Sequence, residues 1–539
     1  MGDPAQQVRD WLDSYDTPHA CVATLLCDRH PPDTVALTEV DADMRTRDLT
    51  YGELATRSRR LASGLADLGV GPGVRVATLM STGHDLVVTM LAIWRLGAVS
   101  VPLFTALAPS AIAHRLDHSA THVVVCDAEH REKITAAGIT ATETRIVVAA
   151  RQRSCPDEVL LSELEQAPRA ETPPVAVGGT APFILLYTPG PVGYPRAVPV
   201  PVRALAAFHA YLVYGLDVDG DDVYWNTTDP GWSYGLYFGV VAPLLAGAGT
   251  VQLRAGFDAE LTLDVLASLG VTNLAAAPTV YRALRASVKS LPPEVAPRRL
   301  SSAGEPLTPD VAAWAQDVFG VPIRDHYGQP ELGICLGAGN HPEVAVEPAP
   351  GSAGIPLPGW RVGVIEPGTE TEAAPGDLGQ VAVDVPNSPL AWFTGYAEPA
   401  RGDVTAVQRF SPSGRWYITG DTGRCDTSGQ VYLASRDHDV IVTSGYRVSP
   451  FEVESLLLGH PAVLEAAVYG LADEIAGQLV AVKVVLQQGW SASVELEEQL
   501  RSVVRRGVGE HAEPRQVDVV TRLPRNASGK IQRGRVRRL

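Results

Sequence analysis

The stretch WYITGDTGRCDTSGQVYLASRDHDVIVTSGYRVSPFEVE, from Trp416 to Glu454, decides how the rest of the chain is divided. A pattern of two strands and a turn precedes the run from Ser435 to Asp439, and a unit punctuated by glycine and proline follows it. Buried strands rarely carry four consecutive charged or titratable residues. We therefore expect this run to join two domains, and chemistry placed here would depend on how the two sides are oriented.

The composition is typical of a globular protein with a large core. The chain has 539 residues, 45% hydrophobic and 19% charged, so we expect one large domain of several lobes and at least one smaller domain. A formal charge of −17 disfavours nucleic acid or an anionic membrane as a partner. The six cysteines lack zinc-ligand spacing and the N-terminus lacks a targeting pattern, which predicts free thiols and a cytoplasmic protein.

One uncharged run, Gly231 to Leu253, is long enough to span a bilayer. Pro243 and the repeated glycines argue against a membrane helix. A helix packed inside an α/β domain and followed by a buried strand explains the same run. We expect this second arrangement.

Helical and strand patterns alternate along the first half of the chain. Thr50 and Glu53 form the N-cap and capping-box pair of a helix that continues to Gly69. Strand patterns lie at 74–79, 99–103, 122–126, 183–186 and 271–276, and helical patterns lie at 85–96 and 261–269. This alternation predicts mostly parallel sheets covered on both faces. Beyond the joint, strands at 440–442, 463–469 and 480–486 with a helix at 450–458 predict a compact α+β domain.

A glycine-rich segment, Tyr187 to Arg196, directly follows the strand at 183–186. Such loops can aim backbone N–H groups at phosphates, and the terminal arginine adds positive charge. Its three prolines each remove one N–H group. The segment alone therefore fits a structural turn as well as a phosphate loop.

Further segments carry side chains suited to nucleotide chemistry. We predict loops at 302–307 and 325–331, where Tyr327 could stack on a base and Glu331 could hold Mg²⁺ through a carboxylate oxygen. Asp421 could accept hydrogen bonds from both ribose hydroxyls, although a Gly-Asp turn would look the same. Lys530 lies in a loop near the C-terminus. Taken singly, each also fits an ordinary turn or an exposed side chain.

In this order and spacing, the segments resemble the adenylate-forming enzyme superfamily, which includes acyl-CoA synthetases, adenylation domains of peptide synthetases and luciferases. The resemblance runs from Leu49 to Lys530 and is most specific at Tyr417-Ile-Thr-Gly-Asp421, 436–454 and 523–533. The run Thr228-Asp-Pro-Gly-Trp-Ser-Tyr-Gly235 is similar to the acid-pocket helix of short- and medium-chain acyl-CoA synthetases.

The resemblance implies a division of the chain into three parts. Residues 1–435 would form a large α/β domain with doubly covered, mostly parallel sheets and a small β-barrel-like subdomain. Residues 436–439 would form a hinge. Residues 440–539 would form a small, mobile α+β domain that rotates about it.

The resemblance also implies two half-reactions that use ATP, Mg²⁺ and CoA. A small or medium carboxylic acid, or another oxyanion, attacks the α-phosphate of ATP, and the thiol of CoA then displaces AMP. The C-terminal domain would rotate between these steps, because a cation at the α-phosphate and a thiol path to the acyl carbon cannot easily share one face. Alternatives are transfer to a carrier protein or an amine, nitrite activation for diazotisation of an aromatic amine, and a nucleotide-binding pseudoenzyme. A homodimer is left open.

The matching positions imply roles for individual residues. Lys530 would contact the α-phosphate and the carboxylate, Glu331 would ligate Mg²⁺, and His438 would lie at the pivot. Tyr327 would stack on adenine, and Asp421 and Arg436 would bind ribose. The nucleotide site as a whole would comprise Thr188, Gly190, Gly193, Arg196, Gly304, Glu305, Pro306, Asp325, Tyr327, Gly328, Asp421 and Arg436. The acid pocket would be bordered by Trp232, Ser233, Tyr234, Gly235 and Tyr237. After rotation, the pantetheine arm would approach Gly445, Tyr446 and Arg447.

The chain departs from the family pattern at the phosphate loop and at the pivot. Three hydroxyl-bearing residues of the loop are replaced by Pro189, Pro191 and Val192, and its lysine is replaced by Arg196. Pro330 replaces a threonine near the α-phosphate. Each lost hydrogen bond to a charged group weakens binding by about 1.5 to 3 kcal/mol. His438 stands where an aspartate is expected, which predicts either a tolerant hinge or a pH-sensitive rotation.

Overall fold

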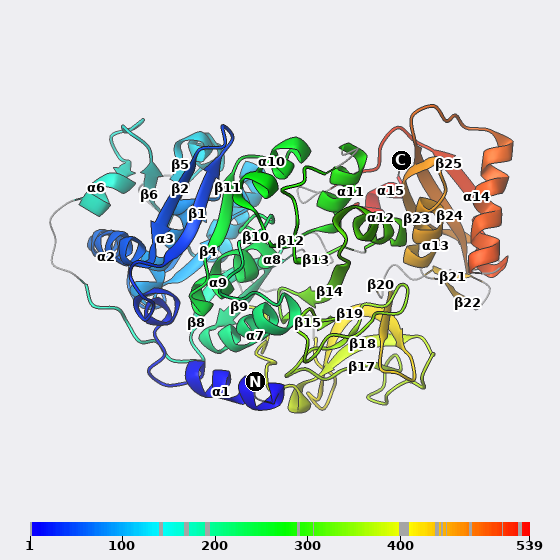
Figure 1. Cartoon of the computed structure of the whole chain (residues 1–539), viewed down its shortest axis with the longest axis horizontal. Coiled ribbons are helices and arrows are strands. Elements are labelled where there is room, and N and C mark those ends of the chain that lie inside the picture. Colours follow the sequence, from blue (N-terminus) through cyan, green and yellow to red (C-terminus); the bar gives the residue numbers. More distant parts are fainter. Residues whose placement is uncertain are drawn as a thin grey trace.

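The computed structural model places three sheets in a large body and a fourth in a smaller C-terminal unit at one end of the long axis (Figure 1). It describes residues 3–139, 144–166, 172–188, 195–287, 291–305, 307–397, 409–436, 441–443, 446–448, 450–473, 477–508, 510–525 and 531–538. The fold class expected from the sequence, a large α/β part with a small α+β part, is confirmed.

The first sheet has seven strands, of which only the last pair is antiparallel. Their order is β7 (Val159–Leu160), β6 (Arg145–Ala149), β5 (Val123–Asp127), β3 (Arg75–Leu79), β4 (Val99–Pro102), β8 (Pro182–Thr188) and β9 (Arg196–Pro201). Helix α2 (Tyr51–Asp67) leads into β3 from the second sheet. The connections within the first sheet contain α3 (His84–Arg95), α4 (Pro109–His118), α5 (Arg131–Ala136) and α6 (Leu161–Gln166). Every residue of β5 is buried, as expected for a parallel strand covered on both faces.

Helix α2 begins where the sequence predicts. The Thr50 side chain accepts a hydrogen bond from the Glu53 N–H, and the Glu53 carboxylate accepts one from the Thr50 N–H. The predicted capping box is therefore confirmed, and it satisfies two backbone donors that the helix leaves unpaired.

The second sheet has nine strands. Their order is β16 (Ile355–Pro356), β15 (Gly333–Gly337), β14 (Ile323–Gln329), β13 (Arg299–Ala303), β12 (Asn273–Ala276), β10 (Tyr224–Asn226), β11 (Thr250–Arg254), β1 (Val35–Asp41) and β2 (Thr46–Thr50). The strands from β14 to β1 are parallel, and the outer pairs are antiparallel. Its connections contain α10 (Ala259–Leu269), α11 (Pro278–Ser287) and α12 (Pro309–Phe319). One hydrophobic core joins residues of the first and second sheets.

The uncharged run from Gly231 folds as expected, as a helical segment followed by a strand. The segment consists of α8 (Ser233–Leu236), a π-helical turn (Tyr237–Val241) and α9 (Ala242–Ala246), and β11 follows it. Pro243 lies in the first turn of α9, directly after the π-helical turn. Among the described residues, no helix combines the length and apolar character needed to cross a membrane.

The third sheet supplies the small β part of the large body. It consists of the antiparallel strands β17 (Val362–Ile365), β18 (Gly379–Asp384), β19 (Trp416–Cys425) and β20 (Val431–Arg436). The remaining helical segments of the body are α1 (Pro4–Tyr15), Thr24–Asp28, Ala128–His130, Val202–Ala204, α7 (Leu205–Ala210), Tyr211–Gly215 and Val385–Asn387.

Two segments expected to be loops, and a third for which a turn was one alternative, contain strand residues. Ser302 and Ala303 end β13, 325–329 lie in β14, and 418–421 lie in β19. The physical reason is pairing with a neighbour, since β14 is hydrogen-bonded to β13 and β15, and β19 to β18 and β20. The polar residues in these strands interrupt the apolar pattern by which a strand is predicted from sequence.

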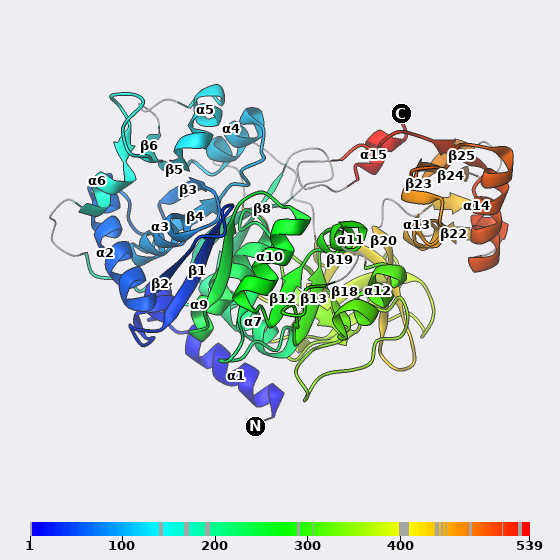
Figure 2. The same ribbon diagram turned by 45° about the horizontal axis from the view of Figure 1, so that its top comes forward.

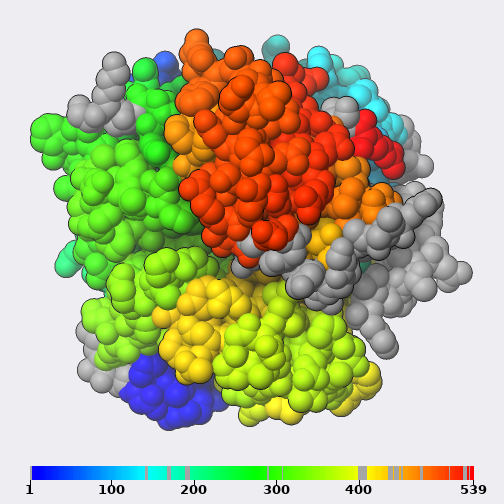
Figure 3. Space-filling view, turned by 90° about the vertical axis from the view of Figure 1, so that its right-hand side faces the viewer, coloured from blue at the N-terminus to red at the C-terminus, as the bar shows by residue number. Residues whose placement is uncertain are grey.

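The C-terminal unit has its own hydrophobic core. It contains β21 (Ile441–Thr443), β22 (Tyr446–Val448), α13 (Pro450–Leu458), β23 (Val463–Asp473), β24 (Gly477–Leu486), α14 (Val494–Gly507), Glu510–Ala512, β25 (Gln516–Val519) and α15 (Arg533–Val536). Figure 2 shows this orange-to-red unit to the right of α11 and α12, and Figure 3 shows it at the front of the molecule. Helix α13 contacts β20. The α+β character predicted for this part of the chain is confirmed.

Candidate active site

The predicted nucleotide residues gather at the carboxyl ends of parallel strands in the second sheet. Gly304 and Glu305 directly follow β13, while Asp325 and Tyr327 lie on the adjacent β14. The two strands are in parallel register, with Ser302 beside Asp325. Ligands of open α/β sheets bind outside the carboxyl ends of the strands. The fold therefore brings two distant motifs to an edge suited to a nucleotide.

The Gly304-Glu305 pair turns the chain away from β13. Gly304 has φ +90°, a conformation that favours glycine. The Glu305 carboxylate accepts hydrogen bonds from the Thr279 hydroxyl at 2.5 Å and from the Arg282 guanidinium at 2.7 Å. The Glu305 side chain is thus fixed to α11. Pro306 lies outside the described residues.

Asp325 is held close to its neighbour on β13. The Ser302 hydroxyl donates a hydrogen bond to Asp325 Oδ1 at 2.5 Å. Burial raises the pKa of Asp325 to about 7, because removal from water disfavours the charged carboxylate. Below that pH the Asp325 carboxyl group is protonated and can donate a hydrogen bond as well as accept one.

Asp421 connects the second sheet to the third. Its Oδ2 accepts hydrogen bonds from the Tyr327 hydroxyl at 2.5 Å and from Gln329 Nε2 at 2.8 Å. Gln329 Nε2 also lies 3.0 Å from the Thr419 carbonyl, and Gln329 Oε1 accepts from the Tyr417 hydroxyl at 3.0 Å. The adenine candidate Tyr327 and the ribose candidate Asp421 are therefore directly hydrogen-bonded, and Gln329 is bonded to both.

Glu331 follows β14 and is only 4% exposed. Its Oε1 accepts a hydrogen bond from the Tyr396 hydroxyl at 2.6 Å, and its Oε2 has no hydrogen bond to any residue that the structure describes. A carboxylate oxygen with open coordination fits Mg²⁺, which takes one or two protein carboxylates and completes its octahedron with water and phosphate oxygens. Glu331 can therefore hold this ion together with a nucleotide.

Two arginines surround Tyr396. Arg196 lies at the start of β9 with its guanidinium carbon 5.0 Å from the Tyr396 ring centroid and Nη1 3.5 Å from the hydroxyl. Arg409 places Nε 3.3 Å from the same hydroxyl and Nη1 3.0 Å from the Thr419 carbonyl. Positive charge thus lies close to Glu331, where phosphates would be neutralised.

The phosphate segment is anchored at both ends. Thr188 at the end of β8 pairs with Arg196 at the start of β9 in an antiparallel ladder. Gly190 and Gly193 lie outside the described residues, as does the whole stretch 189–194. The Tyr187 hydroxyl is bonded to His118 Nδ1 at 2.9 Å, which fixes the strand before the segment to α4.

The predicted acid-pocket residues pack against β14 and the turn after it. The Tyr234 hydroxyl lies 3.2 Å from the Tyr211 hydroxyl, which is bonded to His326 Nδ1 at 2.8 Å. The Tyr237 hydroxyl donates to the Pro330 carbonyl at 3.0 Å. Tyr234, Gly235 and Tyr237 are buried, whereas Trp232 and Ser233 are partly exposed. The acid-pocket motif and the nucleotide motif are therefore brought together.

The structure describes strands on both sides of the joint, whereas residues 437–440 lie outside the described residues. Arg436 pairs with Asp421 across β19 and β20, and Arg447 lies in β22. His438, Gly445 and Lys530 lie outside the described residues. The backbone of Gly328 lies in β14 beside Tyr327, so close to Gly333 that a Cβ atom would clash with its carbonyl.

Two family models match this chain. Residues 26–396 match the AMP-binding enzyme family, and residues 452–530 match the AMP-binding enzyme C-terminal domain. The chain belongs to the AMP-binding enzyme family. The predicted membership of the adenylate-forming superfamily, as an AMP-forming ligase related to acyl-CoA synthetases, is thereby confirmed.

Similar proteins span nearly the whole length of this AMP-binding enzyme. Acetyl-coenzyme A synthetase of Bacillus subtilis is 32% identical over 506 residues, which cover 93% of this chain and 86% of that protein. The crystal structure of an acyl-CoA synthetase from Brucella canis is 39% identical with a TM-score of 0.76 and covers 100% of this chain and 97% of that one. ATP-bound MatB from Rhodopseudomonas palustris is 26% identical with a TM-score of 0.82 over 96% and 98%.

Three residues at the site of this AMP-binding enzyme received no role from its sequence motifs. They are Gln329, Tyr396 and Arg409. Gln329 lies inside a quoted motif, and a polar side chain two positions from Tyr327 shares its face of a strand. No such signal exists for Tyr396 and Arg409, because only the tertiary fold brings them to Glu331.

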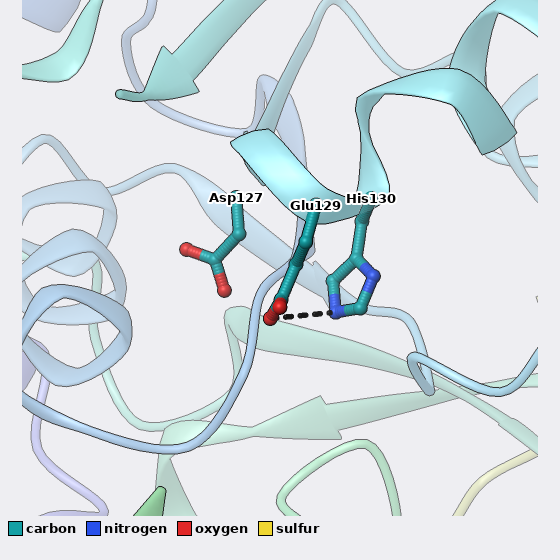
Figure 4. Close-up of side chains that lie close together, drawn as sticks. All are labelled: Asp127, Glu129 and His130. Atoms are coloured by element: carbon teal, nitrogen blue, oxygen red, sulfur yellow. Dashed lines mark ion pairs between the residues drawn. The ribbon is translucent and has the colours of Figure 1, made fainter. Parts of the chain in front are cut away.

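A second cluster of polar side chains lies at the end of β5 in the first sheet. Figure 4 shows Asp127, the last residue of β5, beside the side chains of Glu129 and His130, which are paired at 3.6 Å. Ser81 donates its N–H to Asp127 at 2.7 Å and its hydroxyl to Glu129 at 2.6 Å. These contacts explain the cluster as a tether between the segments after β3 and β5, and we assign no ligand to it.

Proposed function

We propose that this AMP-binding enzyme activates a small to medium carboxylic acid with ATP and Mg²⁺ and then transfers the acyl group to CoA. The observation that carries the proposal is the hydrogen-bonded set of Tyr327, Gln329 and Asp421, formed where the end of β14 meets β19. Glu331, bonded to Tyr396, follows β14. The relatives support CoA as acceptor, since they are named acetyl-CoA synthetase, acyl-CoA synthetase and 4-hydroxybutyrate–CoA ligase.

In the adenylation step, the residues of this edge would bind and orient the nucleotide. Tyr327 would lie against the adenine, with Gly304, Glu305 and Asp325 along its border, and Asp421 would accept the ribose hydroxyls. Asp421 is already bonded to Tyr327 and Gln329, so its carboxylate is oriented before the ligand arrives. Such preorganisation lowers the entropy lost on binding.

Phosphate charge would be offset from two sides. Mg²⁺ held by Glu331 would neutralise phosphate oxygens. Arg196 and Arg409, both close to Tyr396, would supply fixed positive charge. Lys530 would reach the α-phosphate and the acid from the C-terminal unit. These donors act on charge that develops in the transition state, which is where electrostatic stabilisation accelerates a reaction.

The acid would enter beside Trp232 and Ser233. Behind them, aromatic side chains fill the space, with Phe208 and Tyr237 stacked at 4.2 Å between ring centroids and Tyr234 beside Phe238. A wall of buried aromatic rings leaves little length for an acyl chain. This packing supports a small or medium acid over a long-chain fatty acid.

The second step requires the C-terminal unit to turn. We propose that residues 1–435 act as the fixed part, 436–439 as the hinge and 440–539 as the moving part, with His438 at the pivot. Separate hydrophobic cores in the two parts support this division. Gly445, Tyr446 and Arg447 would face the pantetheine arm after rotation.

The test is pyrophosphate release from ATP across a panel of carboxylic acids and nitrite, with CoA or an aromatic amine added. We expect release with a small or medium acid and formation of its CoA thioester. Pyrophosphate release without a thioester would indicate that the acyl group goes to an acceptor other than CoA. Release with nitrite and an amine would indicate a diazotising enzyme. Absence of release under every condition would contradict adenylation itself.

A further inference from the structure

Tyr396 contacts side chains that belong to three different parts of the proposed site. We propose that Tyr396 is a positioning residue that orients the Glu331 carboxylate for the metal–nucleotide complex and couples it to the cation of the phosphate segment. This inference rests on the proposed adenylation and adds to it a residue for which no sequence motif provided a role.

The hydrogen-bond directions around the Tyr396 hydroxyl follow from the partners. A guanidinium can only donate and a carboxylate can only accept. The hydroxyl proton therefore goes to Glu331 Oε1 at 2.6 Å, while the hydroxyl oxygen receives Arg409 Nε at 3.3 Å and Arg196 Nη1 at 3.5 Å. Glu331 Oε1 is thus engaged, and Oε2 is the carboxylate oxygen left for a cation.

The ring of Tyr396 makes a separate contact with Arg196. The Arg196 guanidinium lies over it at 5.0 Å, within the range of a cation–π contact. A planar guanidinium stacks on an aromatic face better than an ammonium does. Tyr396 therefore holds the arginine that stands in place of the lysine expected in the phosphate segment.

The backbone fixes Tyr396 to the same hairpin. The next residue, Ala397, forms an antiparallel bridge with Ala197, and its N–H donates to the Ala197 carbonyl at 2.9 Å. On the other side, the Phe393 ring packs against the Tyr396 ring at 5.0 Å. Movement of the phosphate hairpin would therefore move the hydroxyl that orients Glu331.

Packing alone does not explain a tyrosine at this position. A phenylalanine would keep the contacts of the ring with Phe393 and Arg196. Within the described part of the chain, the hydroxyl is hydrogen-bonded to Glu331 and the two arginines and to no other residue. Removal of the hydroxyl should therefore weaken binding that depends on the metal and leave binding that depends on the ring.

A matched control exists in the third sheet. Tyr432 also donates its hydroxyl to a carboxylate, Asp426, at 3.0 Å, and also lies under an arginine, with Arg424 at 4.2 Å from the ring centroid. It has no contact with Glu331 or Arg196. Tyr432→Phe therefore removes the same kind of hydrogen bond away from the site.

The experiment measures binding of a non-hydrolysable ATP analogue by calorimetry, in excess Mg²⁺ and in EDTA, for the full chain. For Tyr396→Phe, we expect affinity to fall about tenfold with Mg²⁺ and to change less than about twofold in EDTA, the size of one hydrogen bond to a charged group. Tyr396→Leu should weaken binding in both conditions, because it also releases Arg196. Tyr432→Phe should match the unchanged protein in both.

Equal weakening of Tyr396→Phe with and without Mg²⁺, or no weakening, would overturn the inference. Thermal unfolding of each variant shows whether a loss of binding comes from a loss of folding. If Tyr396→Leu remains folded, it is compared with Tyr396→Phe to separate the role of the ring from that of the hydroxyl. Pyrophosphate release separates this inference from the proposed function. If no acid supports release but the Mg²⁺ contrast is observed, adenylation fails and the role of Tyr396 stands.

Discussion

Asp325 illustrates how burial sets the chemistry of a single side chain. Its carboxyl group lies at the edge where a nucleotide is expected, bonded to Ser302, and burial raises its pKa to about 7. In the unfolded chain, the same group titrates near pH 3.9. Between these two values the folded protein keeps a proton that the unfolded chain has lost.

We therefore predict that the free energy of unfolding falls as pH rises from about 4 to about 7, and that Asp325→Asn removes this part of the decline. An amide resembles the protonated carboxyl group and carries no charge to bury. At pH 8 the variant should be more stable by up to about 4 kcal/mol, since the shift of about three pKa units is worth about 1.4 kcal/mol per unit. At pH 4 the two proteins should be alike. Urea unfolding across this range measures both.

The control for this prediction has the opposite sign. Hydrogen bonds from the Ser428 hydroxyl and from backbone N–H groups lower the pKa of Asp426. Its contribution to stability is present above the unfolded pKa and is lost as pH falls, so Asp426→Asn should destabilise the protein at neutral pH and not at low pH. The same trend for both variants would contradict the pKa assignment of Asp325.

Arg196 leads to a second prediction at this scale. Arg196→Lys restores the residue type expected in the phosphate segment but removes a planar group from the Tyr396 ring. We expect the Michaelis constant for ATP to rise about three- to tenfold, the effect of losing a cation–π contact of about 1 kcal/mol. The measurement is pyrophosphate release at varied ATP. A lower Michaelis constant would show that the stacked arrangement does not favour ATP.

At the scale of elements, the buried strands were predictable and the polar strands were not. Residues of the parallel strands β3 and β5 read as apolar runs because both faces are covered. Strand β14 carries Asp, His, Tyr, Gly and Gln at its end because these side chains belong to the site. Its strand character comes from pairing with β13 and β15, which no local sequence pattern indicates.

Strand β19 offers a prediction about such a polar strand. Gly420 has φ +76°, and a Cβ there would meet the Arg409 guanidinium. Gly420→Ala should therefore displace Arg409 from the Thr419 carbonyl and lower the rate of adenylation at least about fivefold, in addition to a backbone cost of about 1 kcal/mol. Pyrophosphate release and thermal unfolding measure the two effects.

Gly414 is the matched position for this change. It has φ +77°, and nothing lies within 4 Å of a Cβ built there. Gly414→Ala should show the same loss of stability with an unchanged rate of adenylation. Similar rates for both alanine variants would mean that Arg409 does not depend on the space that Gly420 leaves.

At the scale of the whole molecule, the sequence predicts the two units but not which distant side chains meet at the candidate site. The charged run at 435–439 and the different patterns before and after it indicate a boundary, and separate cores lie on either side of it. The contact of Tyr396 with Glu331, Arg196 and Arg409 joins segments far apart in sequence. Only long-range folding creates such a contact, so no motif spacing could reveal it.

The proposed rotation predicts that Lys530 serves only one half-reaction. Lys530→Ala should reduce acyl-AMP formation by at least about 100-fold, because a cationic donor to the α-phosphate is removed. Conversion of supplied acyl-AMP to the CoA thioester should change little. Arg506→Ala removes a basic side chain of the same unit, on α14, and should leave both steps unchanged. Equal losses in the two steps for Lys530→Ala would contradict a model with two separate faces.

The β19–β20 hairpin bears on how parts of this chain can be exchanged with those of its relatives. Strand β20 remains hydrogen-bonded to β19 up to Arg436, its last residue, which pairs with Asp421. A graft spliced within β20 would replace one side of this ladder and leave part of β19 as an unpaired edge, a known starting point for aggregation. A chimaera that carries a foreign C-terminal unit should therefore keep native sequence through Arg436.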